Sequence, residues 1–136
     1  MHHVFLKIYF LLFSLWIHDI TADDVVITAD RACDVGFSIG TNNHAECRLT
    51  YWKTKETLIY NCEYSSCWAG PHQWVPMSGC TRESDKHVSA QQCAQYKYTG
   101  QKNVYTCDNP GGVSYTCTYD PSTAPVMACL KCKPKH

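Results

Sequence analysis

The chain has 136 residues, of which ten are cysteines, and its 12 basic side chains balance its 12 acidic ones. The short length and the cysteine density, with every cysteine between Cys33 and Cys132, are typical of secreted disulfide-rich proteins and exclude a large multidomain enzyme. The zero net charge argues against broad electrostatic attraction to nucleic acid or anionic membranes, which needs clustered lysines and arginines. We therefore expect a small secreted monomer without a nucleic-acid or membrane partner.

Residues 1–22 predict a secretory signal peptide. An apolar core over residues 8–17 follows Lys7, and Ala22 supplies a small residue before a cleavage site. Such a core is too short to span a membrane. The alternative, a buried N-terminal helix or strand, is disfavoured because the cysteines begin only after this segment. We expect an extracellular domain of residues 23–136, and uptake into host cells stays open.

Strand-forming stretches flank short polar turns along much of the chain. Residues 48–52 and 57–62 flank 53–56, residues 95–99 and 103–107 flank 100–102, and residues 113–119 follow 109–112. β-Branched and aromatic residues around such turns are typical of antiparallel hairpins. The sequence therefore predicts a small, disulfide-rich, mainly β fold built of antiparallel hairpins.

Two stretches lack a strand pattern. Residues 67–80 are rich in Gly, Pro and Trp and are predicted to form a loop. Residues 83–95 are polar, with Ser84 as a candidate helix cap, so a short helix and a loop stay open there.

Aromatic residues, rather than aliphatic ones, are expected to supply most of the large side chains of the core after residue 22. They are Tyr51, Trp52, Tyr60, Tyr64, Trp68, Trp74, Tyr96, Tyr98, Tyr105, Tyr115 and Tyr119. Disulfides then replace much of a conventional core, since a bridge that closes a loop of ~15 residues stabilises by about 3 kcal/mol.

Two groups of four cysteines have a similar spacing and favour a duplicated β-hairpin module over residues 33–67 and 80–117. The first group is Cys33, Cys47, Cys62 and Cys67, and the second is Cys80, Cys93, Cys107 and Cys117. Chance similarity between hairpins is the alternative and stays open. Cys129 and Cys132 lie outside both groups, and the pairing of the ten cysteines cannot be read from the sequence.

The C-terminal spacing Cys129-x2-Cys132-x3-His136 admits two interpretations. A secretory route favours disulfides for all ten cysteines. The alternative is a zinc site with Cys129, Cys132 and His136 as ligands, because two thiolates at this spacing reach one metal. No cofactor is expected otherwise. Lys131, Lys133 and Lys135 form a small basic tip that is predicted to be a solvated tail.

The best binding candidates are Trp68, His72 and Trp74, in a Gly/Pro-containing loop between two cysteines. Exposed, the two indoles could stack on a sugar or form a protein hot spot; buried, they are simply core. Residues of acid–base type are present, namely His44, Glu46, His72, Arg82, Glu83 and His87, but their spacing defines no catalytic site. We therefore expect no enzymatic activity and assign no catalytic residue.

A short chain with a leader, many cysteines, Tyr-x-Cys phrases such as Tyr60-Asn61-Cys62 and no enzyme motif resembles the small secreted cysteine-rich effectors of plant-pathogenic fungi. The weak repeat and the Cys129–His136 spacing are similar to those of zinc-binding, two-module effectors of rust fungi. This resemblance implies a virulence protein that binds a host protein or glycan. A disulfide-rich inhibitor, with residues 73–79 or 108–112 as its reactive loop, and a carbohydrate-binding module are the alternatives.

Overall fold

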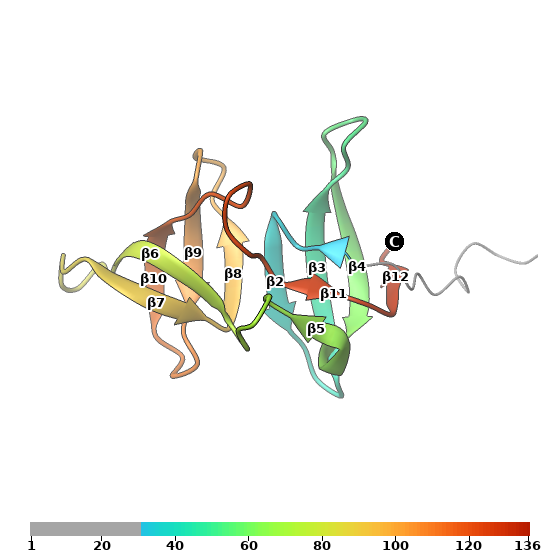
Figure 1. Ribbon diagram of the computed structural model, residues 1–136, viewed down its shortest axis with the longest axis horizontal. Helices are drawn as coiled ribbons and strands as arrows, with labels where there is room; N and C mark the ends of the chain where they lie inside the picture. Colours follow the sequence, from blue (N-terminus) through green and yellow to red (C-terminus); the bar gives the residue numbers. More distant parts are fainter. Residues whose placement is uncertain (1–30) are drawn as a thin grey trace, which may run out of the picture.

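The computed structural model describes residues 31–136, and the predicted signal peptide lies outside the described residues. This part consists of antiparallel strands and one short 3₁₀ helix, η3 (Tyr64–Ser66), and contains no α-helix (Figure 1). The strands are β1 (Arg31–Ala32), β2 (Gly36–Ile39), β3 (His44–Thr50), β4 (Thr57–Glu63), β5 (Cys67–Trp68), β6 (Val75–Thr81), β7 (Ser89–Cys93), β8 (Gln95–Tyr98), β9 (Val104–Asp108), β10 (Ser114–Thr118), β11 (Ala128–Cys129) and β12 (Cys132–Pro134). Together with five disulfides, they confirm the prediction of a small, disulfide-rich, mainly β fold.

The strands form two lobes that meet where β2 pairs with β8 (Figure 1). One sheet has the order β12-β4-β3-β2-β8-β9-β10-β6-β7, and a second has the order β1-β11-β5. We call β1–β5 with β11 and β12 the terminal lobe, and β6–β10 the inserted lobe, because the chain leaves the terminal lobe after β5 and returns at β11. The three-stranded sheet lies across β3, to which the Cys33–Cys47 disulfide ties it.

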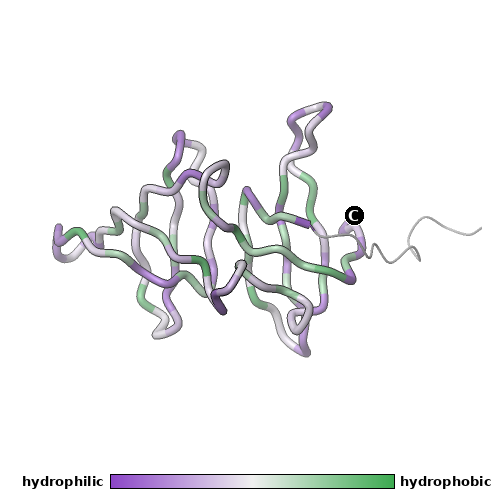
Figure 2. The backbone as a smooth tube through the Cα atoms, in the orientation of Figure 1, coloured by the Kyte–Doolittle hydropathy of each residue, from purple (hydrophilic) through white to green (hydrophobic). Residues whose placement is uncertain are grey.

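The hairpins predicted around residues 53–56, 100–102 and 109–112 are confirmed, and they join β3 to β4, β8 to β9 and β9 to β10. Polar residues occupy these turns, and Figure 2 shows hydrophilic chain at the ends of the hairpins. Asn103, with φ of 60°, takes the left-handed conformation that Asn tolerates better than most residues. Turn chemistry therefore sets the positions of these strands.

The predictions for the two remaining stretches are wrong in part. The short helix in residues 83–95 is absent, and β7 occupies residues 89–93 of that stretch as an extended strand. The predicted loop of residues 67–80 contains β5 and most of β6, because Val75 and Met77 alternate into the core along β6. Both stretches become strands because they pair with segments that are distant in the sequence. A local sequence pattern does not reveal such pairing.

The two lobes share a strand order and a disulfide pattern. Reading outward from the β2–β8 pair, β2, β3, β4 and β12 correspond to β8, β9, β10 and β6. Cys33–Cys47 corresponds to Cys93–Cys107, with the same separation of 14 residues, and Cys62–Cys132 corresponds to Cys80–Cys117. This correspondence of cysteines differs from the one predicted from their spacing in the sequence, which matched Cys33 with Cys80. Cys67–Cys129 has no counterpart in the inserted lobe.

Cysteines and tyrosines dominate the buried core, as the composition predicts. The buried hydrophobic residues include nine cysteines together with Phe37, Tyr60, Val75, Met77, Tyr96, Tyr105, Tyr119 and Met127. Trp52 departs most from the prediction that these aromatic residues belong to the core, because 71% of its surface is exposed. Burial raises the pKa of Tyr105 to about 12, and that of Tyr119 likewise, so both hydroxyls stay protonated at neutral pH.

Gly36 is where the lobes approach most closely, opposite Lys97 of β8. A Cβ atom placed on Gly36 would lie 3.1 Å from the carbonyl oxygen of Tyr96, which belongs to the backbone and cannot swing away. We expect Gly36→Val to lower the free energy of unfolding by about 1–3 kcal/mol, as overpacking does in cores. Urea unfolding followed by tryptophan fluorescence measures this.

The matched control is Lys97→Val, which places the same β-branched side chain on the exposed partner position. Its effect should stay within about 0.5 kcal/mol. Equal stability of Gly36→Val and wild-type protein would show that the β2–β8 junction tolerates a side chain.

Candidate binding surfaces

The predicted site residues Trp68, His72 and Trp74 do not form a paired aromatic platform. Trp68 lies in β5 opposite Ala128 of β11 and is half-buried, and the half-buried Trp74 directly precedes β6. Neither indole makes a ring–ring contact within residues 31–136. His72 is exposed on a tight turn closed by two backbone hydrogen bonds with Ala69, 3.1 and 3.2 Å long.

Residues 51–56 form the turn between β3 and β4, and this turn projects the Trp52 side chain into solvent. Tyr51 N–H donates to the Glu56 carbonyl and Lys55 N–H to the Tyr51 carbonyl, each over 2.8 Å. Lys55 adopts a φ of 62°, which closes the turn. Lys53 Nζ lies 5.1 Å from the centroid of the Trp52 ring, so a cation covers part of the indole. The result is an ordered hairpin tip with an exposed aromatic ring.

A cavity of about 450 Å³ lies at the base of this hairpin. Its lining includes Leu49, Leu58 and Tyr60, together with Trp52 and Arg31. The Arg31 guanidinium carbon lies 5.5 Å from the centroid of the Tyr60 ring. Arg31 Nε is buried and has no hydrogen-bond partner among the described residues. An apolar surface with one cationic edge therefore adjoins the exposed tryptophan.

A larger groove, of about 750 Å³, lies over β2, β3, β4 and β12. Ion pairs cross it: Lys135 Nζ lies 2.6 Å from Glu46 Oε2, and Lys131 Nζ lies 3.0 Å from Glu63 Oε2. The hydrogen bond from Lys135, with help from Arg48, lowers the pKa of Glu46. The prediction that the basic tip is a solvated tail is wrong, because it includes β12, which pairs with β4.

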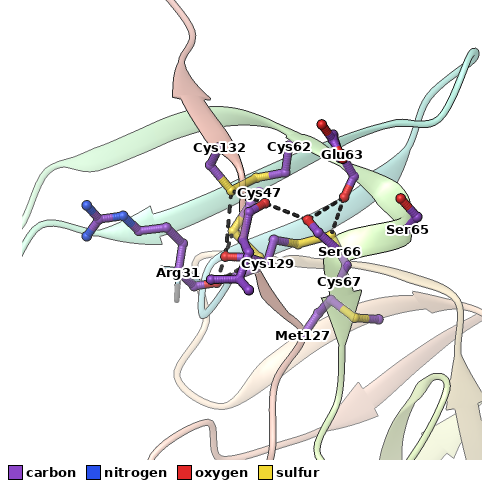
Figure 3. The surroundings of a disulfide bond; sticks show 12 residues. Arg31, Cys47, Cys62, Glu63, Ser65, Ser66, Cys67, Met127, Cys129 and Cys132 are labelled. Atoms are coloured by element: carbon purple, nitrogen blue, oxygen red, sulfur yellow. Dashed lines mark hydrogen bonds between the residues drawn. A yellow bond between two sulfur atoms is a disulfide. The ribbon is translucent and has the colours of Figure 1, made fainter. Parts of the chain in front are cut away.

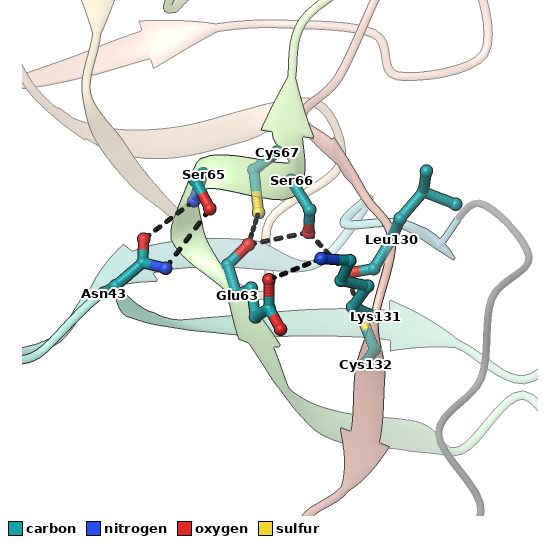
Figure 4. A network of polar contacts seen from close by, with 8 residues as sticks. All are labelled: Asn43, Glu63, Ser65, Ser66, Cys67, Leu130, Lys131 and Cys132. Atoms are coloured by element: carbon teal, nitrogen blue, oxygen red, sulfur yellow. Dashed lines mark hydrogen bonds and ion pairs between the residues drawn. The ribbon is translucent and has the colours of Figure 1, made fainter.

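A polar network fixes the corner between β11 and β12 (Figure 4). Ser66 Oγ donates to the Glu63 carbonyl over 2.7 Å and lies 2.5 Å from the Leu130 carbonyl oxygen, while Leu130 N–H donates to the Ser66 carbonyl over 3.1 Å. Asn43 Oδ1 accepts from Ser65 N–H over 2.9 Å, which ties the β2–β3 turn to the same corner. These contacts hold Lys131 over the groove, and no sequence motif signals them.

The cysteines at the C-terminal end bond to the first half of the chain and not to each other (Figure 3). Cys132 pairs with Cys62 and Cys129 with Cys67, and none of the ten cysteines is free. The alternative zinc site needs Cys129 and Cys132 as thiolates beside His136, and both sulfurs are used in disulfides instead. Two further groups of three close sulfurs, around Cys33 and Cys93, are likewise disulfide-bonded.

The side chains of acid–base type lie on three separate elements. His44 and Glu46 are on β3, His72 is on the 69–72 turn, and Arg82, Glu83 and His87 are in or beside the β6–β7 connection. The hydrogen bond from the His87 backbone N–H, followed by the ion pair with Arg82 at 2.5 Å, lowers the pKa of Asp85. The residues considered for acid–base chemistry therefore do not converge on one site.

No helix within residues 31–136 is long and apolar enough to cross a membrane. No protein-family model matches the chain, and neither a curated protein nor a solved structure matches it.

Proposed function

We propose that this is a secreted effector-type protein that acts by binding a host protein rather than by catalysis. Its five disulfides and the absence of a membrane-spanning helix in the described residues are compatible with secretion. The observation that carries the proposal is Trp52, held 71% exposed at the tip of an ordered hairpin. Trp52 also lines the cavity formed by Leu49, Leu58 and Tyr60, and a contiguous exposed apolar surface of this kind marks an interaction site.

The chemistry of the hairpin specifies the kind of partner. Tryptophan is the residue most enriched at the energetic centres of protein interfaces, where it fills an apolar pocket. Lys53 lies over the Trp52 ring and Lys55 follows in the same turn, and these two positive charges favour a partner whose pocket has an acidic rim. The turn is closed by its own hydrogen bonds, so little conformational entropy is lost when it docks. A folded protein with an apolar, acid-rimmed cleft fits these features.

Trp52→Ala tests the proposal. A photo-crosslinking residue at position 53 should capture a partner from host extracellular fluid that the same residue at position 101, on the β8–β9 turn, does not capture. With the purified partner, Trp52→Ala should raise the dissociation constant about 30-fold or more, as the loss of a hot spot does. Because Trp52 is exposed, the stability of the protein should not change.

The control is Val88→Ala, which removes another exposed apolar side chain, 62% accessible, from the inserted lobe. Its binding should match that of wild-type protein. A partner that binds wild-type and Trp52→Ala protein equally well would contradict the proposal. Pull-down on chitin or another glycan that is lost in Trp52→Ala or Trp74→Ala would replace the protein partner with a carbohydrate.

The inhibitor alternative loses one of the two loops that the sequence indicated, and the other, residues 108–112, stays open. Most of residues 73–79 belongs to β6, with Val75 and Met77 buried, so that segment cannot enter a protease. Residues 109–112 form a tight turn in which Asn109 N–H donates to the Val113 carbonyl. Measured inhibition of a host protease that depends on Trp52 or Lys53 would identify the partner as that protease.

A further inference from the structure

The groove over β2, β3, β4 and β12 is a second surface with a chemistry of its own. Register places four side chains in one row across it, with Lys133 opposite Asn61, Asn61 opposite Glu46, and Glu46 opposite Ser38. Residues directly opposite one another in antiparallel strands point to the same face. This row therefore forms the floor of the groove, and Glu63 and His44 form the next row.

Lys133 is the cation of the groove that the protein does not neutralise. Three lysines and two glutamates line the groove, and the ion pairs use Lys131 with Glu63 and Lys135 with Glu46. The exposed Lys133 ammonium has no ion pair or hydrogen bond within the described residues. The Asn61 amide and the Ser38 hydroxyl in the same row also lack side-chain hydrogen bonds there. Glu46, the fourth member of the row, is already paired with Lys135 and Arg48. The floor thus offers a ligand one unpaired positive charge and two uncharged polar groups.

Strand addition at the edge of β12 is disfavoured, although β12 is an edge strand. Lys135 N–H donates to the Ile59 carbonyl over 2.8 Å, and hydrogen-bonded pairs alternate along an antiparallel ladder. The backbone polar groups of Cys132 and Pro134 therefore point away from β4, toward the open edge, and Pro134 has no N–H to donate there. A proline in this position blunts a sheet edge. A ligand would instead lie across the face, over the side chains.

We propose that this groove binds an extended acidic peptide segment of a partner protein, with a carboxylate on Lys133 Nζ. Asn61 and Ser38 would hydrogen-bond its backbone. The row from Lys133 to Ser38 crosses four strands that lie about 4.8 Å apart, so it spans about 14 Å, the length of roughly four residues of an extended peptide. No Trp, Tyr or Phe ring lines the groove for a sugar to stack on, which favours a peptide over an acidic glycan.

The probe is a fluorescein-labelled octapeptide that alternates Glu and Ser, compared with the same peptide carrying Gln in place of Glu. Fluorescence anisotropy with the disulfide-bonded protein should show saturable binding that weakens as salt is raised. Lys133→Gln should raise the dissociation constant for the Glu peptide about fivefold, which is the upper range of the effect of losing one exposed ion pair. Lys86→Gln, a lysine of the inserted lobe, should leave it unchanged.

Trp52→Ala should also leave peptide binding unchanged, so this result is independent of the hairpin and of the proposed function. Amide shifts at Ser38, Asn61 and Lys133 in ¹H–¹⁵N spectra should accompany binding. Equal affinity of wild-type and Lys133→Gln protein, equal affinity of the Glu and Gln peptides, or no binding would each overturn the proposal. Binding of polygalacturonate without binding of the peptide would assign the groove to an acidic glycan instead.

Discussion

Removing both Cys62–Cys132 and Cys67–Cys129 is expected to lower the free energy of unfolding by about 6 kcal/mol, whereas removing either one alone should cost only about 2–3 kcal/mol. The two disulfides join neighbouring positions on the same two segments, with sequence separations of 70 and 62. While one is intact, the other closes a ring of only about ten residues. Once one is gone, the survivor closes a ring of about 27 or 35 residues that runs through Cys80–Cys117, which is worth about 3.7 kcal/mol.

The measurement is a double-mutant cycle with paired Cys→Ala substitutions, followed by urea unfolding of the remaining oxidised protein. The effect of removing both disulfides should exceed the sum of the two single effects by about 1 kcal/mol. The control is removal of Cys93–Cys107, in the other lobe, whose effect should add to that of either single removal. Additivity between the two C-terminal disulfides would contradict the nested arrangement.

Tyr96→Ala should also destabilise strongly, by about 3–5 kcal/mol, as the loss of a buried aromatic side chain does. Tyr96 belongs to β8 of the inserted lobe, and its hydroxyl reaches two residues next to the strands of the terminal lobe. It donates to the Cys33 carbonyl over 2.8 Å and accepts from Met127 N–H over 3.1 Å. Its ring also packs against Phe37, with centroids 6.3 Å apart. One side chain thus closes the interface between the lobes.

Tyr96→Phe separates the two contributions. It keeps the ring and leaves the Met127 N–H and the Cys33 carbonyl buried without this partner, which should cost about 1–3 kcal/mol. Tyr98→Phe is the control, because Tyr98 lies in the same strand, half-buried, and its hydroxyl makes no hydrogen bond within the described residues. Urea unfolding measures all three variants. Equal stability of Tyr96→Phe and wild-type protein would show that the hydroxyl does not hold the lobes together.

Hairpins whose strands are adjacent in sequence could be predicted, and strands that pair with distant segments could not. The turns at residues 53–56 and 109–112 carry local signals, so β3, β4, β9 and β10 follow from them. β12 contains two residues that disfavour strands, Lys133 and Pro134, and becomes a strand because Cys132 is bonded to Cys62. Disulfide pairing was the missing information, and it cannot be obtained from one sequence.

The candidate sites show the same division. The sequence could identify aromatic residues but could not distinguish exposed from buried ones, so it indicated Trp68 and Trp74 and included Trp52 in the core. Trp52 is exposed because β3 ends at Thr50, two residues earlier than the predicted strand. The groove around Lys133 could not be predicted either, because its floor combines side chains from four strands.

The β3–β4 hairpin has one further property, which concerns the covalent continuity of the chain. Cys33–Cys47 closes before it, and every other disulfide joins residues from Cys62 onward. Between Cys33 and Cys132, residues 48–61 are therefore the only stretch that no disulfide spans. A protease that cut beside Lys53 would divide the protein into two pieces with no covalent link between them, whereas a cut in any other loop of that region would leave the pieces bonded. Binding through this hairpin, as proposed, therefore requires a partner that does not cleave it.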